Sequence, residues 1–476
     1  MSVEILSRIQ FAFTVAFHYI YPPLSIGLGV VLVLLEGQYL RTRNPMYERL
    51  TRFWIRIFAL IFGIGVATGI VMEFEFGTNW ATYSRYVGDI FGSALAAEGI
   101  FAFALESGFL GILLFGWNRV PSWVHFLSTV MVALGSMFSA VWIVVANSWQ
   151  QTPAGFHIVG AGLTARAEVT DFWAMVFNPS SVDRLSHVLI GSLLAGSFLV
   201  LSVSAWYVLN GRFVESSKAA FRIALLVATL SGLGQLFTGH RSAEGVSVNQ
   251  PAKLAAFEGH YPASAPADLY LLGWVDNKTQ TVKGLALPGG LSILLHQDPQ
   301  APVKGLRSFR PEDRPPVNFV FQTYHLMVAI GMALIGLTLL ASWLLWRGRL
   351  WQTRWLLAVF VGAVLLPQLA NQLGWYSAEV GRQPWVVYGL LRTSDALSKA
   401  VTAGQVWFSL ILFTLVYALL FALFLYLLTK KIQHGPDEHE LSEADHLSPA
   451  SKRHNPAMSH EAPGAPAADL AHVSDL

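Results

Sequence analysis

Long uninterrupted apolar segments constrain this chain more than any other feature of its sequence. A helix that crosses the hydrocarbon core of a bilayer needs about 20 mainly apolar residues. We predict nine such spans, at residues 8–38, 53–76, 92–116, 122–146, 183–209, 217–238, 318–345, 353–373 and 404–429. Only 13% of the 476 residues are charged, whereas a typical soluble domain carries about 25%. The sequence therefore predicts an all-α integral membrane protein whose first span is kinked at Pro22–Pro23.

Basic residues in the short loops predict the orientation of the chain, because cytoplasmic loops are enriched in Lys and Arg. Every second loop is basic, starting with the loop after the first span and ending with the segment after the ninth. The basic residues in these loops are Arg41, Arg43, Arg49, Arg52, Arg119, Arg212, Lys218, Arg347, Arg349, Arg354, Lys430 and Lys431. We therefore expect an outward-facing N-terminus and a cytoplasmic C-terminus. Arg382, Arg392 and Lys399 are exceptions on the outer side.

Two segments lie outside the predicted spans. Residues 239–317 form a long outer loop, and the polar composition of 433–476, with its irregularly spaced His residues, predicts a disordered cytoplasmic tail. The predicted organisation is helices one to six (1–238), the outer loop, helices seven to nine (318–432) and the tail. The chain has no Cys, which excludes disulfides and thiolate metal sites.

Four side chains that can bind iron fall in the outer half of the predicted membrane region: His18, His187, Met327 and Glu379. Imidazole, thioether and carboxylate groups are all known metal or haem ligands. Other roles stay open, because a single His in a span is often a hydrogen-bonding or pore residue and a Met often fills a core. Glu379 could also pair with Arg382, one turn further on. Composition alone therefore does not establish haem.

Two acidic residues, Glu98 and Glu106, lie on one predicted span, eight residues or about 12 Å apart along a helix axis. Ionisable groups inside spans usually face the interior of the bundle and can pass protons. The alternative is a pair of structural acids that are hydrogen-bonded to neighbouring helices. Ser107, Ser139 and Asn147 could extend a polar track from them.

The outer side carries two further polar groupings. Gly381–Trp385 has the sequence GRQPW, and its Arg382 could bind a carboxylate or a haem propionate. Gln250–Tyr261 predicts a short helix at the start of the outer loop, on which Lys253 and Glu258 could contact a small ligand.

Many of these residues lie in strings that closely resemble subunit I of the cytochrome bd-type quinol oxidases. The strings are FAFTVAFHYIYPPLSIGL, MEFEFGTNWATYSRYVGDIFGSALAAEG, SAVWIVVANSWQQTP, NQPAKLAAFEGHY and AEVGRQPW, spread over most of residues 1–410. The nine spans and the outward N-terminus agree with that family, and the resemblance implies a bacterial inner membrane, in which the N-terminus would be periplasmic.

The resemblance implies three haems, two haem b and one haem d or a haem b in its place. His187 and Met327 would be the axial ligands of a low-spin haem b. His18 and Glu379 would ligate the two high-spin haems, in an order that stays open. Arg382 and Asn147 complete the haem contacts that we predict.

The resemblance also implies roles for other polar residues. Glu98 would lie beside the oxygen-reducing haem, Trp375 would lie between haems, and Glu106, Ser107 and Ser139 would belong to a proton path from the cytoplasm. Quinol would be oxidised at the outer face, and the oxidase would reduce O₂ to water and generate a proton motive force without pumping. The expected partners are a second membrane subunit, possibly small single-span subunits, the lipid bilayer, O₂ and ubiquinol or menaquinol, with no nucleic acid.

Lys253 and Glu258 would bind or deprotonate the quinol. His325 stands where some members have Arg, Glu75 stands where Gln is common, and the outer loop is short. These departures are similar to the cyanide-insensitive branch and leave the type of the third haem open.

Three other classes of protein fit less well. A haem-copper oxidase needs several His for its copper, but the spans hold only His18, His125, His187 and His325. A proton-coupled transporter would be favoured by inverted repeats, and none is visible. A dihaem electron-transfer anchor would need His pairs on facing helices, which are also missing.

Overall fold

The structure, a computed structural model, describes residues 1–436 apart from the side chains of Glu73 and Leu163. The predicted tail, 433–476, lies almost entirely outside the described residues. Within these, eight helices are long and apolar enough to cross a membrane, and one bent helix pair makes a ninth possible span. The prediction of an all-α membrane protein with about nine spans is confirmed.

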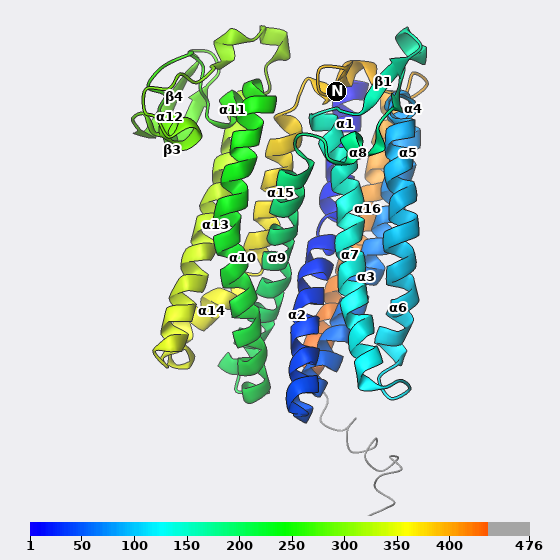
Figure 1. Cartoon of the computed structure of the whole chain (residues 1–476), viewed down its shortest axis with the longest axis vertical. Helices are drawn as coiled ribbons and strands as arrows, with labels where there is room; N and C mark the ends of the chain where they lie inside the picture. Colours follow the sequence, from blue (N-terminus) through cyan, green and yellow to red (C-terminus); the bar gives the residue numbers. More distant parts are fainter. Residues whose placement is uncertain (437–476) are drawn as a thin grey trace, which may run out of the picture. The chain divides into compact units, whose positions relative to one another are not determined.

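The spans run side by side along one axis (Figure 1). They are α1 (Val3–His18) with α2 (Tyr21–Thr42), α3 (Pro45–Thr78), α5 (Gly88–Ala97) with α6 (Ala104–Phe115), α7 (Ser122–Gln151), α9 (Ser181–Leu209), α10 (Val214–Asn249), α13 (Val317–Trp346), α14 (Arg354–Gly362) with α15 (Leu365–Val380), and α16 (Ala403–His434). The pair α14 and α15 is bent by 41°.

The first span is interrupted at Tyr19–Ile20, directly before the predicted kink. Pro22 and Pro23 have no backbone N–H, so they cannot donate to the carbonyls four residues earlier, at His18 and Tyr19. The helix therefore ends at His18 and restarts at Tyr21. This break leaves His18 at the end of a helix in the middle of the bundle.

A π-helical segment, Glu98–Phe103, joins α5 to α6 and was not predicted. Eight residues of regular α-helix would place Glu98 and Glu106 about 80° apart around the axis. The wider turns of the π segment reduce this angle, and both carboxylates face α7. Such segments often occur at functional sites.

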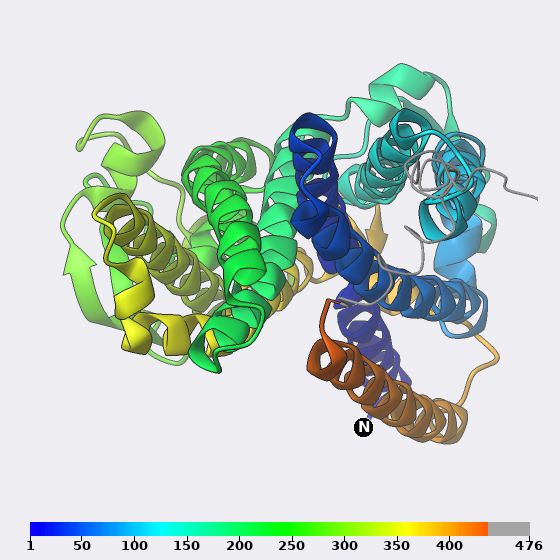
Figure 2. The same ribbon diagram turned by 90° about the horizontal axis from the view of Figure 1, so that it is seen from below.

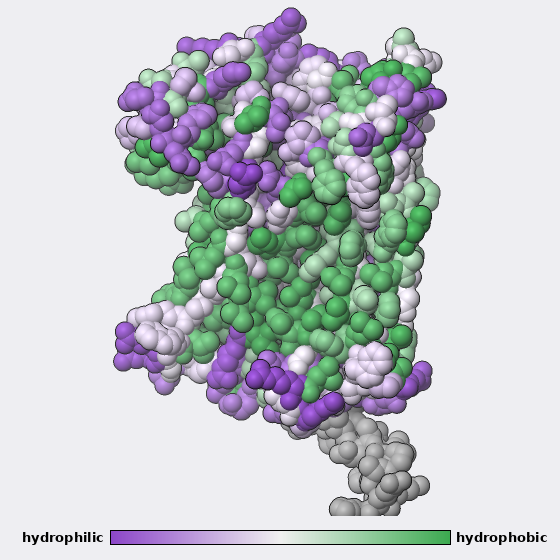
Figure 3. Space-filling model, in the orientation of Figure 1, coloured by the Kyte–Doolittle hydropathy of each residue, from purple (hydrophilic) through white to green (hydrophobic). Residues whose placement is uncertain are grey.

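The core is centred on α9, which packs against α2, α7, α10 and α14. At the crossing of α2 and α9, a Cβ on Gly27 would lie 2.3 Å from the carbonyl oxygen of Ser192. Small residues thus let these two backbones approach closely, as is common between membrane helices. Seen along the bundle, α9, α10 and α13 to α15 lie on one side and α5 to α7 on the other (Figure 2). Apolar residues cover the middle of the face seen in Figure 3, between two polar ends.

Short elements cover one end of the bundle (Figure 1). They are α4 (Ala81–Tyr86), the antiparallel pair β1 (Phe156–Val159) and β2 (Arg166–Val169), α8 (Phe172–Val176), α11 (Pro251–Phe257), the antiparallel hairpin β3 (Leu269–Asp276) and β4 (Thr281–Leu287), α12 (Gly290–His296), and the antiparallel pair β5 (Trp385–Val387) and β6 (Leu391–Arg392). The short helix predicted after Pro251 is present as α11.

Candidate functional site

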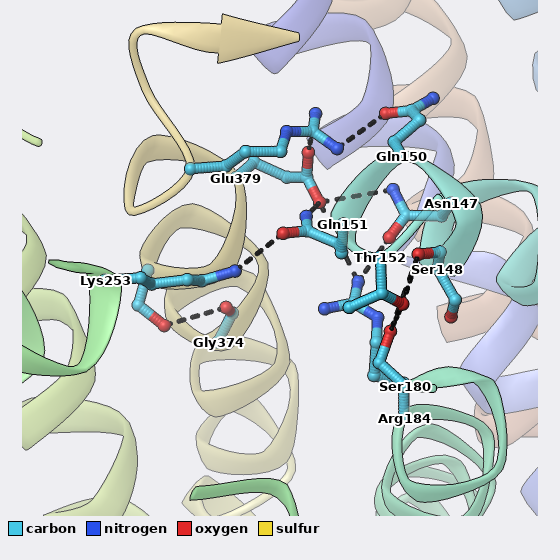
Figure 4. Close-up of polar contacts among 12 residues, drawn as sticks. Asn147, Ser148, Gln150, Gln151, Thr152, Ser180, Arg184, Lys253, Gly374 and Glu379 are labelled. Carbon is cyan, nitrogen blue, oxygen red and sulfur yellow. Dashed lines mark hydrogen bonds and ion pairs between the residues drawn. The ribbon is translucent and has the colours of Figure 1, made fainter. Parts of the chain in front are cut away.

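Glu379 is the centre of a buried polar cluster where α7, α9 and α15 meet (Figure 4). It lies in the last turn of α15, whereas the sequence placed it just past the end of that span. Its Oε2 accepts from Arg382 at 2.5 Å, so the predicted one-turn pairing is present. Its Oε1 accepts from Asn147 at 3.2 Å and from Gln151 at 3.1 Å, and the guanidinium of Arg184 is 3.8 Å away.

Lys253 adds a third basic group to this cluster from α11. Its amine donates to Gln151 at 2.9 Å (Figure 4) and to Gln250 at 3.1 Å. Burial, together with the nearby positive charge of Arg184, lowers the pKa of Lys253 well below its usual range. Two buried guanidinium Nε atoms, those of Arg184 and Arg382, have no hydrogen-bond partner. Three basic groups thus surround a single carboxylate, an excess of positive charge that suits an anionic ligand.

Glu258 caps the end of α11 and is buried. Its Oε2 has no hydrogen-bond partner, and burial raises the pKa of Glu258 to about 8. Phe257, beside it, stacks on Tyr324 with ring centroids 4.5 Å apart. Glu258 makes no ion pair with Lys253, which points instead toward the Glu379 cluster. The two predicted quinol residues therefore share a short helix and differ in their surroundings.

His187 lies in the second turn of α9, where its Nδ1 is 3.2 Å from the hydroxyl of Thr238 on α10. That hydroxyl donates to Gln235 at 3.0 Å, so it accepts a hydrogen bond from Nδ1–H. Nε2 then carries the lone pair that a metal needs. The next residue, Gly239, packs against the imidazole, because a Cβ there would lie 3.5 Å from its Cε1.

His18 has the same surroundings on a different pair of helices. Its Nδ1 is 3.0 Å from the hydroxyl of Thr68 on α3, which donates to the carbonyl of Ile64. Its Nε2 is again left with the free lone pair. A Cβ on Gly69 would lie 3.2 Å from the imidazole Cε1.

Met327, on α13, faces α15. A Cβ on Gly374 would lie only 2.8 Å from the Met327 sulfur. Trp375 follows this glycine, with its ring 5.4 Å from that of Tyr19 and 5.7 Å from the guanidinium of Arg184. Trp375 therefore lies between the end of α1 and the Glu379 cluster.

The two acids of the predicted proton path each accept from a serine of α7. Ser136 donates to Glu106 and Ser139 to Glu98, both at 2.5 Å. Ser107, in contrast, is exposed on the outside of this chain. Ser136, one turn before Ser139, is therefore the hydroxyl beside Glu106, and the sequence analysis did not single it out.

Several other site residues escaped the sequence analysis: Gln150, Gln151, Arg184, Thr68 and Thr238. Gln150 and Gln151 stand in the string ANSWQQTP, from which only Asn147 was selected. Gln150 accepts from Arg382 at 2.7 Å. Arg184 could have been selected from the sequence, because it is a basic residue just inside the start of the fifth predicted span.

Comparisons with known proteins agree on one family. Residues 6–436 match the family described as cytochrome bd terminal oxidase subunit I. The cytochrome bd ubiquinol oxidase subunit 1 of Bacillus subtilis is 39% identical over 92% of this chain and 95% of its own length. The cytochrome bd-II ubiquinol oxidase subunit 1 of Escherichia coli is 35% identical over 90% and 96%.

A solved structure shares the fold as well. The bd oxidase from Geobacillus thermodenitrificans superposes with a TM-score of 0.84 at 29% identity, over 91% of this chain and 99% of that chain. The chain therefore belongs to the cytochrome bd terminal oxidase subunit I family and is a multi-pass membrane subunit of a quinol oxidase.

Proposed function

We propose that this chain holds the haems of its oxidase, oxidises quinol at the outer face and supplies cytoplasmic protons for the reduction of O₂ to water. One observation carries the proposal: Glu379 and Lys253 meet at the Asn147–Gln151 end of α7, while Glu98 and Glu106 accept from Ser139 and Ser136, about two to three turns further along the same helix. Charge would then cross the membrane during turnover without a pump.

The residues present fit haem in three respects. His18 and His187 each direct Nδ1 to a threonine, which leaves Nε2 for iron. His18, His187 and Met327 each pack against a glycine of a neighbouring helix, and a Cβ would crowd the His18 ring at 3.2 Å and the Met327 sulfur at 2.8 Å. The excess of positive charge around Glu379 suits haem propionates.

We assign His187 and Met327 to a low-spin haem b, and His18 and Glu379 to two high-spin haems, a second haem b and a haem d or a haem b in its place. When bound, the haems would supply one-electron transfer and O₂ binding. Arg382 and Asn147 hold the Glu379 carboxylate in place, and Trp375 fills the space between the ligand clusters.

For the quinol we assign Lys253 and Glu258. The unpartnered Oε2 of Glu258 accepts a hydrogen bond from a quinol hydroxyl and takes its proton when the carboxyl is ionised. The Lys253 amine donates to two glutamines, which hold it where it can contact a quinol oxygen. Phe257 offers an apolar contact beside them. The quinol is ubiquinol or menaquinol.

For protons we assign Glu106 and Glu98, each joined to a serine hydroxyl. A hydroxyl both donates and accepts, so Ser136 and Ser139 can pass a proton along α7 between the two acids. Ser107 faces away from this track and would join it only through a neighbouring subunit.

The apolar outer faces of the bundle suit a second membrane subunit and small single-span subunits in the bacterial inner membrane, with the N-terminus periplasmic. We assign the chain to the cyanide-insensitive branch of the family, because His325 and Glu75 differ from the residues common in other members. His325 is held between the carbonyl oxygens of Phe321 and Tyr270.

The first test is the reduced-minus-oxidised absorption spectrum of the purified oxidase with analysis of its extracted haems. Haem b, with or without a red-shifted chlorin band, is the expected result and determines the third haem. A preparation without haem would overturn the ligand assignments.

A further inference from the structure

The hairpin of β3 and β4 runs alongside the outer turns of α13. Three hydrogen bonds join strand to helix: Val275 N to Asn318 Oδ1 (3.1 Å), Gln322 Nε2 to Gly273 O (2.8 Å) and His325 Nε2 with Tyr270 O (2.7 Å). Asn318 and His325 are seven residues or about 10 Å apart along the helix axis. The strand therefore descends beside a membrane-spanning helix by that distance, with its Leu269 end lowest.

The depth of that lower end follows from the length of α13. Trp343 and Trp346, both exposed, and then Arg347 mark the opposite interface. The hydrocarbon core is about 30 Å thick, or about 20 helical residues. Counting back from Leu345 reaches His325, the residue that is hydrogen-bonded to Tyr270. Any tilt of α13 moves the boundary further outward along the helix and places the strand deeper.

The side chains of the hairpin change character along the same direction. Along the strands from the level of Trp274 down to that of Leu287, and on α12, six large apolar residues are half exposed or more: Leu271, Leu272, Trp274, Leu285, Leu287 and Ile293. An irregularity between Tyr270 and Leu272 interrupts the alternation of faces, so two neighbouring leucines are exposed together. The turn at the other end carries Lys278 and Thr279. Apolar residues are visible at the lower edge of this lobe, which overhangs the side of the bundle (Figures 1 and 3).

We propose that the lower half of the β3–β4 hairpin, together with α12, is seated in the outer interfacial layer of the lipid bilayer. Six exposed apolar side chains on one lobe would be costly in water and are typical of an interaction surface. Those of β3 and β4 lie from the level of Leu269 to less than about 10 Å outward of His325, continuous with the apolar belt of α13, and this identifies lipid as the occupant. A tryptophan at this boundary, Trp274, is typical of membrane interfaces. The outer loop is then held by two attachments, α13 and the bilayer.

The absence of Cys from this chain allows a direct test. Single substitutions Leu272→Cys and Leu285→Cys introduce a thiol at exposed apolar positions, while Lys278→Cys and Thr281→Cys are matched controls at the turn end of the same hairpin. Each variant of the whole oxidase is reconstituted in bilayers and labelled with a thiol-reactive fluorophore. The parent oxidase, treated in the same way, gives the background from partner subunits.

We expect a lipid that carries a quencher near its headgroup to remove most of the fluorescence at positions 272 and 285, and aqueous iodide to remove little. The controls should show the reverse. Equal quenching by iodide at all four positions would place the hairpin in water and overturn the proposal. Protection of positions 272 and 285 from both quenchers would also overturn it, because a protein partner would then cover the surface.

Discussion

Glu258 should make quinol oxidation depend on pH in a range where an ordinary glutamate is already fully ionised. Burial raises the pKa of Glu258 to about 8. With that value, about 1% of the carboxyl groups are ionised at pH 6, about 10% at pH 7 and half at pH 8. Because the ionised form accepts the quinol proton, kcat/KM for a soluble quinol should rise roughly tenfold per pH unit up to about pH 7.5 and then level off.

The assay is oxygen consumption by the purified oxidase between pH 6 and 9. Glu258→Gln should lose most of the activity, retain the haem spectrum and show no pH dependence in the residual rate. Glu244→Gln is the matched control, because it removes an acid from the outer end of α10 that pairs with Arg241 near the surface. A flat profile for the parent enzyme, or an unchanged rate for Glu258→Gln, would refute the assignment.

The same raised pKa has a consequence for stability. The folded state keeps the proton of Glu258 at pH values where the unfolded chain has lost it, so folding takes up a proton. This contribution is fully present below the ordinary pKa of 4.5 and is lost as the pH rises through about 8. The free energy of unfolding should fall by about 5 kcal/mol over that interval. Thermal denaturation of Glu258→Gln should lack this part of the alkaline destabilisation, and identical pH profiles for both proteins would contradict the burial argument.

Three further predictions concern ligand geometry and stability. Met327→Ala should convert the low-spin haem signal to a high-spin one, whereas Met332→Ala, on an exposed face of the same helix, should not; a retained low-spin spectrum would exclude Met327 as a ligand. Thr68→Val keeps the side-chain volume but frees the histidine that Thr68 holds, so haem occupancy measured on extracted pigment should fall, by about 10- to 100-fold in affinity; unchanged occupancy after dilution would show that the hydroxyl does not orient the ring. Glu36→Ala removes the buried hydrogen-bond partner of His125, 2.6 Å away, and should cost about 1–3 kcal/mol of stability, read as a lower denaturation temperature that an unaltered melting curve would contradict.

The number and type of spans could be predicted because the length of an apolar run determines whether it can cross a bilayer. The ends could not. Helix α10 continues to Asn249, beyond the predicted end at residue 238, because hydropathy does not detect a helix that leaves the membrane and stays helical in polar surroundings. The π segment after Glu98 also has no signal in a single sequence, because its apolar residues fit a regular helix equally well.

The site was predictable as a set of residues but not as an arrangement. Glu379 could be singled out because an acid at the end of an apolar span is unusual, yet its partners Asn147, Gln151 and Arg184 come from α7 and α9, far away in sequence. Only packing of the helices brings these groups together. The serine beside Glu106 shows the same limit. Ser107 follows Glu106 in the sequence, but Ser136, on α7, donates the hydrogen bond to its carboxylate.

His18 and His187 share one local arrangement, in which a Thr–Gly dipeptide of a neighbouring helix contacts the imidazole. Thr68–Gly69 on α3 faces His18, and Thr238–Gly239 on α10 faces His187. In each dipeptide the hydroxyl accepts from Nδ1–H and the glycine packs against the imidazole. A Cβ on Gly69 would crowd the His18 ring at 3.2 Å, whereas one on Gly239 would make ordinary contact with His187 at 3.5 Å. Without the threonine, the tautomer of either ring would be unfixed. The repetition on two unrelated helix pairs argues that both rings are held for the same purpose, presenting Nε2 to a metal.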